Sequence, residues 1–275
     1  MQTITSLQNQ HVKDAAKLRE RREREKQGRL LIDGARELGR ALAAGIEVLD
    51  VFVCESLCRS DEAKLALGLI GPSRARVLAV TPPVFAKLAY GDRAEGVVGV
   101  AKMPRRSLGD LRLPERALVA IVEGIEKPGN LGAILRSADA AGVSALIATG
   151  RGTDLYNPNV IRSSLGTVFT LPVVAAGVDD ALQFVREQRL PVFAARVDAA
   201  LLYTAAPLGE SAAIVLGSET DGLSEAWQAD DVRPIKLPML GVADSLNVSA
   251  AAAVLFYEAL RQRGMRGTAT GDARR

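Results

Sequence analysis

Short apolar runs alternate with amphipathic segments along most of the chain, a pattern that is typical of an α/β protein. In the first part of the chain the pattern predicts strands over residues 29–33, 48–53, 76–80 and 97–101, and helices over 35–44, 62–69 and 82–89. The stretch that follows, up to residue 116, contains Pro104, Gly109 and Pro114 among many charges, which indicates a connecting segment. We therefore predict a small α/β domain over residues 1–105 and a linker over 106–116.

A second α/β pattern begins after this linker. Residues 117–122 are continuously apolar, as expected for a parallel strand that is buried on both faces of its sheet. Further along, the pattern predicts strands over 145–148, 169–174, 191–195, 212–216 and 232–237, and helices over 132–141, 159–165, 179–188 and 248–263. We expect a second domain with a parallel sheet over residues 117–264, followed by a flexible polar tail over 265–275.

The composition is that of an ordinary folded protein. Of the 275 residues, 48% are hydrophobic and 24% are charged, which excludes a disordered or collagen-like chain. The longest apolar runs, such as residues 250–257, are shorter than the ~20 residues that a membrane span requires. The N-terminus lacks a charged segment followed by an apolar one, so we expect no signal peptide and a cytoplasmic location.

Histidine and cysteine are too rare for several kinds of catalytic site. The one histidine, His11, lies at the start of a polar segment, so we expect neither a Ser-His-Asp triad nor a histidine general base. Cys54 and Cys58 form a lone Cys-x-x-x-Cys without further ligands, which is a poor zinc site. We interpret both cysteines as small, partly buried side chains and expect no bound metal.

Positive charge is concentrated near the N-terminus. The net charge is only +3, but residues 13–29 hold eight basic and four acidic side chains at helical spacing. This segment is interpreted either as a salt-bridged surface helix or as a helix that contacts phosphates through Arg21, Arg22 and Arg24. A second basic cluster consists of Lys102, Arg105 and Arg106.

Three loops that follow predicted buried strands combine glycine with polar residues, as ligand-binding loops of α/β proteins do. In the first, over 123–136, we expect Asn130 to cap a helix, and Arg136 requires either an anion or water in an otherwise apolar helix. In the second, over 216–223, two glycines bracket two carboxylates, which suits either a close approach to a ligand or a plain turn. In the third, over 237–250, Asn247 or Ser249 is expected to cap the last helix. A cap explains one of these polar residues, but it does not explain the presence of Ser245, Asn247 and Ser249 together.

Common nucleotide-binding fingerprints are missing. The predicted strand at 117–122 is followed by Glu-Gly-Ile-Glu-Lys-Pro-Gly-Asn and not by Gly-x-Gly-x-x-Gly, and the chain contains no Walker loop. A conventional Rossmann cofactor site is therefore not expected. This disfavours the interpretation of the chain as a nucleotide-dependent oxidoreductase. A binding experiment that shows no affinity for NAD would exclude that interpretation.

The three loops together resemble the three motifs of the SpoU (TrmH-like) RNA 2′-O-ribose methyltransferases of the SPOUT class. The matching segments are Asn130-Leu-Gly-Ala-Ile-Leu-Arg136, Gly217-Ser-Glu-Thr-Asp-Gly222 and Leu237-Pro-Met-Leu-Gly241 continued by Ser245-Leu-Asn-Val-Ser249, in the same order and spacing. The first domain resembles the L30e-like RNA-binding domain that is often fused in front of them, through the basic segment and Ile32-Asp-Gly-Ala-Arg-Glu-Leu38. The resemblance implies a parallel sheet with a deep trefoil knot, S-adenosylmethionine as cofactor, and a homodimer with the active site at its interface.

The resemblance also implies roles for individual residues. The implied cofactor contacts are Thr149, Gly150, Leu216, Gly217, Leu237 (where isoleucine is commoner in the family) and Leu246. The implied catalytic residues are Asn130, Arg136, Glu219, Ser245 and Asn247, and Arg162 resembles a family arginine that faces RNA.

The chemistry fits an arginine-centred site. A ribose hydroxyl is a poor nucleophile that requires orientation and help in losing its proton. Arginine stays protonated, so we expect Arg136 to hold a phosphate and stabilise the developing alkoxide while a carboxylate or water takes the proton. The sequence thus predicts methyl transfer to a ribose of RNA. By family analogy with its large first domain, ribosomal RNA (23S) is favoured over transfer RNA, and a non-catalytic RNA-binding protein is the alternative.

Overall fold

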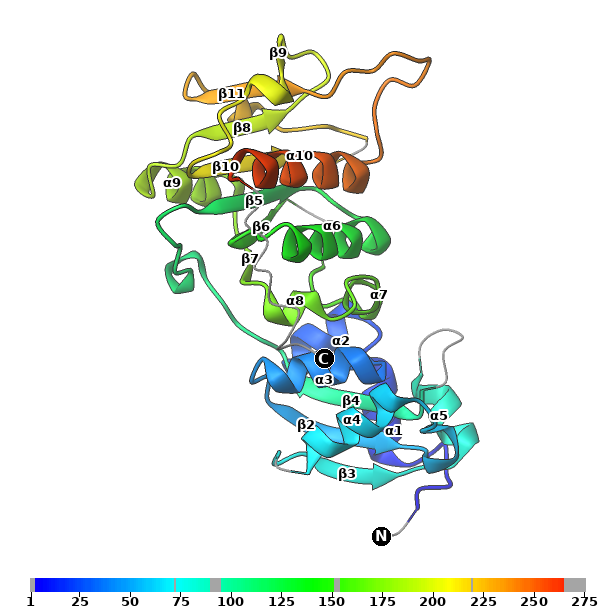
Figure 1. Cartoon of the computed structure of the whole chain (residues 1–275). Coiled ribbons are helices and arrows are strands. Elements are labelled where there is room, and N and C mark those ends of the chain that lie inside the picture. Colours follow the sequence, from blue (N-terminus) through cyan, green and yellow to red (C-terminus); the bar gives the residue numbers. More distant parts are fainter. Residues whose placement is uncertain (1–2, 72, 90–94, 151–153, 219, 265–275) are drawn as a thin grey trace. The chain divides into compact units, whose positions relative to one another are not determined.

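The computed structural model describes residues 3–264 apart from residues 72, 90–94, 151–153 and 219 (Figure 1). The described chain forms two compact units. The first unit contains residues 1–106, 127–136 and 154–172, and the second contains 107–126, 137–153 and 173–275. No helix in the described part of the chain is long and apolar enough to cross a membrane.

A four-stranded sheet with the order β1-β4-β2-β3 forms the centre of the first unit. Strand β4 pairs antiparallel with both β1 and β2, and β3 pairs parallel with β2. Apolar side chains such as Leu31, Phe52 and Val98 are fully buried on this sheet. The strands are β1 (Arg29–Asp33), β2 (Val48–Val53), β3 (Arg76–Ala79) and β4 (Val97–Lys102).

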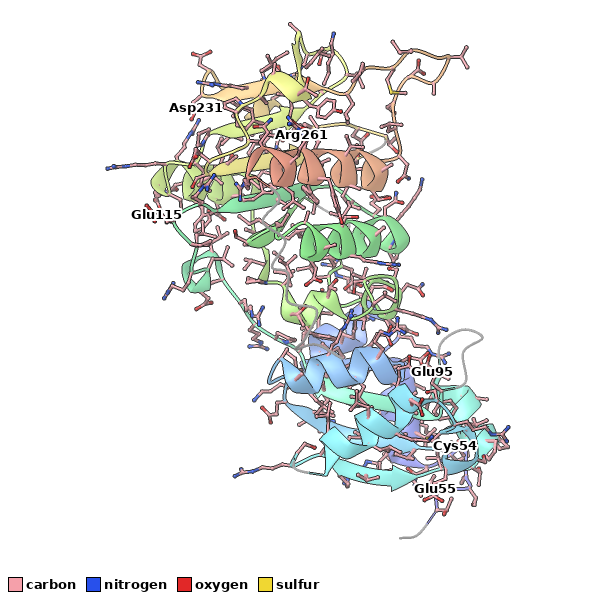
Figure 2. All side chains as sticks on the ribbon, viewed as in Figure 1. Cys54, Glu55, Glu95, Glu115, Asp231 and Arg261 are labelled. Carbon is pink, nitrogen blue, oxygen red and sulfur yellow. The ribbon has the colours of Figure 1, made fainter. Side chains whose placement is uncertain are left out.

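Helices surround this sheet, and two of them come from the later part of the chain. Helix α7 (Pro158–Ser163) packs against β1, and α8 (Thr167–Thr170) packs against α3 (Ala35–Ala43). The remaining helices of the unit are α1 (Gln10–Lys17), α2 (Arg21–Gln27), α4 (Asp61–Ile70) and α5 (Pro82–Leu88). Both cysteines of the unit carry free thiols: Cys54 (Figure 2) is buried, and Cys58 is half-buried. Burial also raises the pKa of the Cys58 thiol.

The second unit is built on a seven-stranded parallel sheet with the order β7-β6-β5-β10-β8-β11-β9, and its strands follow one another in this order in Figure 1. Every residue of β5 and β10 is buried, as their continuous apolar sequences predict. The strands are β5 (Leu118–Glu123), β6 (Ala145–Thr149), β7 (Val173–Ala175), β8 (Val192–Ala195), β9 (Leu201–Leu202), β10 (Ala212–Leu216) and β11 (Val232–Lys236).

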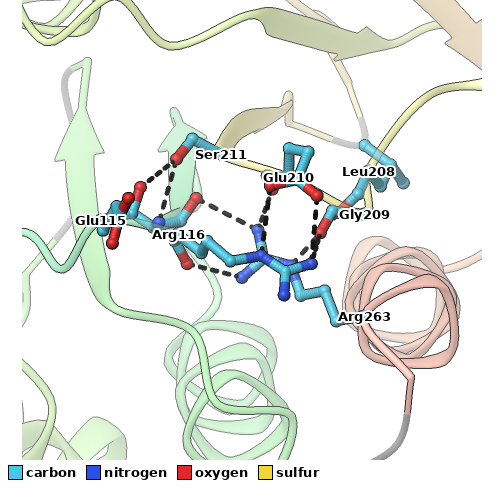
Figure 3. A network of polar contacts seen from close by, with 8 residues as sticks. Glu115, Arg116, Leu208, Gly209, Glu210, Ser211 and Arg263 are labelled. Atoms are coloured by element: carbon cyan, nitrogen blue, oxygen red, sulfur yellow. Dashed lines mark hydrogen bonds and ion pairs between the residues drawn. The ribbon is translucent and has the colours of Figure 1, made fainter.

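Two helices pack on this sheet: α9 (Val178–Glu187) against β6, and α10 (Val248–Gln262) against β10. A network of backbone carbonyls and two arginines fixes the end of α10 (Figure 3). The Arg263 guanidinium donates hydrogen bonds to the carbonyls of Arg116 at 3.1 Å, Ala117 at 3.1 Å and Leu208 at 3.2 Å. Burial and the neighbouring Arg116 lower the pKa of Arg263, although the guanidinium stays charged. The network therefore fixes the C-terminal end of α10. The third motif loop leads into the N-terminal end of the same helix.

The α/β class and the parallel sheet confirm the sequence prediction, and most elements lie within two residues of their predicted bounds. The predicted strand over 169–174 is wrong: residues 167–170 form α8, and only Val173–Ala175 pair in the sheet. Gly166, in the left-handed conformation at φ +80°, starts a helical turn that buries Val168 and Phe169. The knot stays a prediction of the family resemblance.

Two details of the helices also differ from the predictions. The predicted cap at Asn130 is wrong, because the long helix α6 (Pro128–Ala140) begins at Pro128, and proline suits the first helical position. The basic segment forms two helices, α1 and α2, and Arg29 already belongs to β1.

Candidate active site

A cavity of about 540 Å³ lies in the second unit, where the strands of the sheet end. Loops that follow β8, β10 and β11 line the cavity together with the first turns of α10. Its size is in the range of small-molecule sites, and the carboxyl edge of a parallel sheet is where open α/β sheets bind ligands. The second and third motif loops therefore meet at one cavity.

The loop after β10 closes into a tight turn. The amide of Ser218 donates a hydrogen bond to the carbonyl of Gly222 at 3.1 Å, and the reverse bond measures 3.2 Å. The buried carboxylate of Glu123, at the end of β5, accepts a hydrogen bond from the amide of Ser224 at 3.0 Å. A Cβ atom on Gly217 would lie 2.2 Å from the carbonyl oxygen of Gly222. Glycine is therefore required at residue 217 to close the turn.

Four of the six residues predicted to contact the cofactor line the cavity: Leu216, Gly217, Leu237 and Leu246. Thr149 and Gly150 do not line it. Thr149 is buried at the end of β6, where its hydroxyl donates to the carbonyl of Val122 at 3.4 Å. Gly150 has a φ of +79° and lies against the backbone of Gly124. The roles of all six residues in binding stay predictions.

The sequence interpretation missed the part of the cavity wall that follows β8. Arg196, Val197 and Asp198 line the cavity, and the Arg196 guanidinium donates to both carboxylate oxygens of Asp198, at 2.9 and 2.7 Å. This hydrogen bonding lowers the pKa of Asp198. The strand itself was predicted, but its loop has no glycine to mark it. Its position after a parallel strand is the signal that could have identified it.

The third motif loop leads into α10 through a side-chain cap. The Asn247 side-chain oxygen accepts hydrogen bonds from the amide of Ser249 at 3.0 Å and from its hydroxyl at 2.6 Å, which confirms Asn247 as the cap. Ser245 lines the cavity two residues earlier. Both Ser245 and Asn247 are exposed.

The first motif forms helix α6. Arg136 is exposed on this helix and forms no ion pair or hydrogen bond with other described residues. Asn130 is half-buried in the first turn of the helix. Gly132 is needed for close packing, because a Cβ atom there would lie 1.8 Å from the Ser163 hydroxyl oxygen of α7. Glu219, the remaining predicted catalytic residue, lies outside the described residues.

The four predicted RNA contacts differ in their surroundings. Arg22 is exposed, and Arg21 is exposed beside Glu25, with 2.8 Å between guanidinium and carboxylate. Arg24 is only 1% exposed, and its guanidinium donates to the carbonyls of Leu18 and Arg19 and to the carboxylate of Asp154. Arg162 is half-buried and lies 3.3 Å from the buried carboxylate of Asp33. The part of all four residues in RNA binding stays a prediction, and the buried guanidinium of Arg24 is already occupied by contacts within the protein.

Fold and cavity together define an α/β protein of two units, one of which has a cavity of small-molecule size at the carboxyl edge of its parallel sheet. Residues 117–257 match the model of the SpoU rRNA methylase family, and residues 9–99 match that of the MRM3-like substrate binding domain. The chain belongs to the SpoU rRNA methylase family, which confirms the resemblance of the three motifs.

Relatives match nearly the whole chain. The chain is 31% identical to a 23S rRNA (uridine(2479)-2′-O)-methyltransferase of Streptomyces viridochromogenes, over 97% of this chain and 94% of that protein. A solved RNA 2′-O ribose methyltransferase is 43% identical, with a TM-score of 0.83 over 95% of this chain and 99% of that one. The SpoU methyltransferase AviRb from Streptomyces viridochromogenes, solved in complex with AdoMet, is 29% identical, with a TM-score of 0.84 over 93% of this chain and 98% of that one.

We expect Gly217→Ala to weaken the binding of S-adenosylmethionine by about 10- to 100-fold, because opening the turn costs about 1–3 kcal/mol. Isothermal titration calorimetry measures this change. Gly241→Ala is the matched control, since a Cβ atom at residue 241 meets no atom within 4 Å. Equal affinities for a folded Gly217→Ala protein and the control would remove this turn from the binding site.

Proposed function

We propose that this protein transfers a methyl group from S-adenosylmethionine to the 2′-hydroxyl of a ribose in 23S rRNA. The cavity of about 540 Å³ carries this proposal, because it gathers two of the family's three motif loops at the carboxyl edge of a parallel sheet. The relatives that match most of the chain are ribose 2′-O-methyltransferases of RNA. Residues 9–99 of the first unit, which match a substrate-binding domain, supply the RNA-binding part.

The residues of the cavity fit S-adenosylmethionine. Leu223, Leu237 and Leu246 offer an apolar surface for an adenine ring, and the turn at Gly217 brings backbone groups close to a ligand. Arg196 and Asp198 offer opposite charges suited to the amino and carboxylate groups of the cofactor's methionine part. When bound, the cofactor supplies a methyl group that is activated by the positive sulfur to which it is attached.

Arg136 is proposed to act on the RNA. Its guanidinium is exposed and has no carboxylate partner among the described residues, so its fork of donors can hold a phosphate. The same charge stabilises the alkoxide that develops as the ribose hydroxyl loses its proton. Arginine does not accept this proton at working pH, so a carboxylate or water takes it, and Glu219 is our candidate.

We propose that the remaining polar residues of the motifs, Asn130, Ser245 and Asn247, position the reacting groups. Asn247 fixes the first turn of α10 through its two hydrogen bonds with Ser249, and this turn directly follows the loop that carries Ser245. Asn130 stands in the first turn of the helix that carries Arg136. Each of these residues therefore belongs to an element that sets the geometry of a motif loop.

A homodimer and a cytoplasmic location complete the proposal. The second unit exposes several large apolar side chains in the third motif loop and on α10, and a second copy of the chain would cover such a surface. The exposed residues are Leu240, Val242, Leu246, Val254 and Tyr257. Ribosomal RNA as substrate supports a cytoplasmic location.

Mapping of 2′-O-methyl groups tests the proposed activity. In a strain from which the gene is deleted, we expect one 2′-O-methyl group to be missing from 23S rRNA and all such groups of transfer RNA to remain. The purified protein with S-adenosylmethionine should restore the missing group on the unmodified 23S rRNA. Loss of a transfer-RNA methyl group with intact 23S rRNA would contradict the substrate, and no loss anywhere would contradict the activity.

A further inference from the structure

A second hollow, of about 750 Å³, lies entirely within the first unit and has no part in the site described above. It is formed where α2 turns into β1, where the chain enters β2, and where β4 ends. We call it the basic hollow, because Arg29, Lys102, Arg105 and Arg106 line it against one acidic residue, Glu47.

Backbone pairing holds the basic hollow open. The amide of Lys102 donates to the carbonyl of Glu47 at 2.9 Å, and the amide of Met103 donates to the carbonyl of Gly28 at 2.8 Å. Gly28, at φ +61°, ends α2 in the left-handed conformation and turns the chain directly into β1. All three segments of the wall are thus joined to one another, so a ligand would meet a preformed site.

The positive charges of the hollow are not neutralised by the protein. Arg29, Arg105 and Arg106 are exposed and form no ion pair with other described residues. Lys102 lies 3.2 Å from the carboxylate of Glu47, and both side chains are well exposed, so this pair contributes little to stability. Several cations around one concave surface attract a polyanion, and arginine forks suit phosphate oxygens.

Part of the lining of the hollow is apolar, and we call this part the apolar floor. Ile46, Leu49, Met103 and Pro104 form it and are half-buried. A surface that only follows a phosphate backbone needs no such floor. An unpaired RNA base, by contrast, offers a flat face that packs on apolar side chains or guanidinium planes.

We propose that the basic hollow binds an unpaired nucleotide of the substrate RNA, with the flanking phosphates on Arg29, Arg105 and Arg106 and the base on the apolar floor. This inference rests on the proposed function only in taking RNA as the substrate. It adds a recognition site that selects loops and bulges over continuous duplex. The hollow thus contributes to the choice of methylation site at a place distinct from the cofactor cavity.

Binding of two short RNAs to the full chain tests this proposal. The probes are a labelled hairpin with an unpaired loop and a blunt duplex with the same number of nucleotides, and fluorescence anisotropy is measured over a series of KCl concentrations. We expect the wild type to bind the hairpin more tightly. Arg105→Gln combined with Arg106→Gln should weaken hairpin binding by about tenfold or more and reduce the salt slope by roughly 0.7–0.9 for each lost phosphate contact.

Two further variants separate the contribution of the positive charges to RNA binding from the contribution of the apolar floor. Arg59→Gln combined with Arg74→Gln removes the same charge from exposed positions of the same unit outside the hollow, and should leave hairpin binding nearly unchanged. Met103→Ser keeps the positive charges of the hollow but removes one apolar side chain from its floor. It should weaken hairpin binding by about 2- to 10-fold without affecting duplex binding. An unchanged midpoint of the first transition in urea unfolding, followed by circular dichroism, shows that the first unit of each variant is folded.

Three results would overturn the proposal: equal losses in the two double variants, equal effects of Met103→Ser on both RNAs, or equal affinities of the wild type for the hairpin and the duplex. The proposed activity is tested separately, since these measurements involve no methyl transfer. A wild type that binds as expected but methylates no RNA leaves the basic hollow in place and refutes the proposed reaction.

Discussion

Arg136→Lys is expected to lower the rate of RNA methylation by about 10²–10³-fold and to leave the affinity for S-adenosylmethionine unchanged. Lysine keeps the charge, but it loses the planar fork that would hold a phosphate and the ribose oxygen together. The loss of one such contact in the transition state costs about 3–4 kcal/mol. Single-turnover transfer of a radioactive methyl group to saturating 23S rRNA measures the rate, and calorimetry measures cofactor binding.

Arg233→Lys serves as the control for Arg136→Lys. Arg233 is exposed on β11 and does not line the cavity, so the same exchange should leave the rate at the wild-type value. A folded Arg136→Lys or Arg136→Ala protein that methylates RNA at the wild-type rate would show that Arg136 is a surface arginine without a catalytic role.

Arg24→Ala is expected to destabilise the first unit by about 3 kcal/mol. The substitution removes the buried partner of Asp154 and leaves the carbonyls of Leu18 and Arg19 without their donor. Breaking a buried ion pair costs about 3–5 kcal/mol, and we take the lower end because 19% of the Asp154 side chain is exposed. The midpoint of the first transition in urea unfolding, followed by circular dichroism, measures the loss.

Arg22→Ala is the matched control for Arg24→Ala. Arg22 stands two residues earlier on the same helix and is exposed, so its replacement should change stability by no more than about 0.5 kcal/mol. Equal unfolding midpoints for the two variants would mean that the contacts of Arg24 do not hold α2 in place.

Periodicity was enough to predict most strands of the two sheets, but it predicted no strand at β9 and misplaced the start of β7. Strand β10 has the predicted bounds because it is a continuous apolar run between Ser211 and Gly217, and β2 has them although Asp50 interrupts its apolar run. The prediction of a strand over residues 169–174 was wrong because a short apolar run fits a buried helical turn as well as a strand. Local rules also misplaced the start of α6, where proline at the first helical position outweighed a cap at Asn130.

Contacts between distant parts of the chain explain what the sequence could not predict. The charge pattern places Arg24 among exposed arginines, but its partner, Asp154, lies 130 residues further along the chain, and only the fold brings the two together. The cavity wall at Arg196 and Asp198 was missed because only the topology shows that β8 ends beside β10 and β11. The family motifs, by contrast, are local in sequence and could be recognised directly.

The return of residues 154–172 to the first unit affects the order in which the protein can fold during synthesis. Helices α7 and α8 cover β1 and α3, and Asp154 neutralises the buried Arg24, so the first 106 residues leave the ribosome with these surfaces uncovered. Domains usually fold as units from the N-terminus while the chain is being made. Here the N-terminal unit is complete only after residue 172 has emerged, together with two strands, β5 and β6, of the sheet that belongs to the second unit.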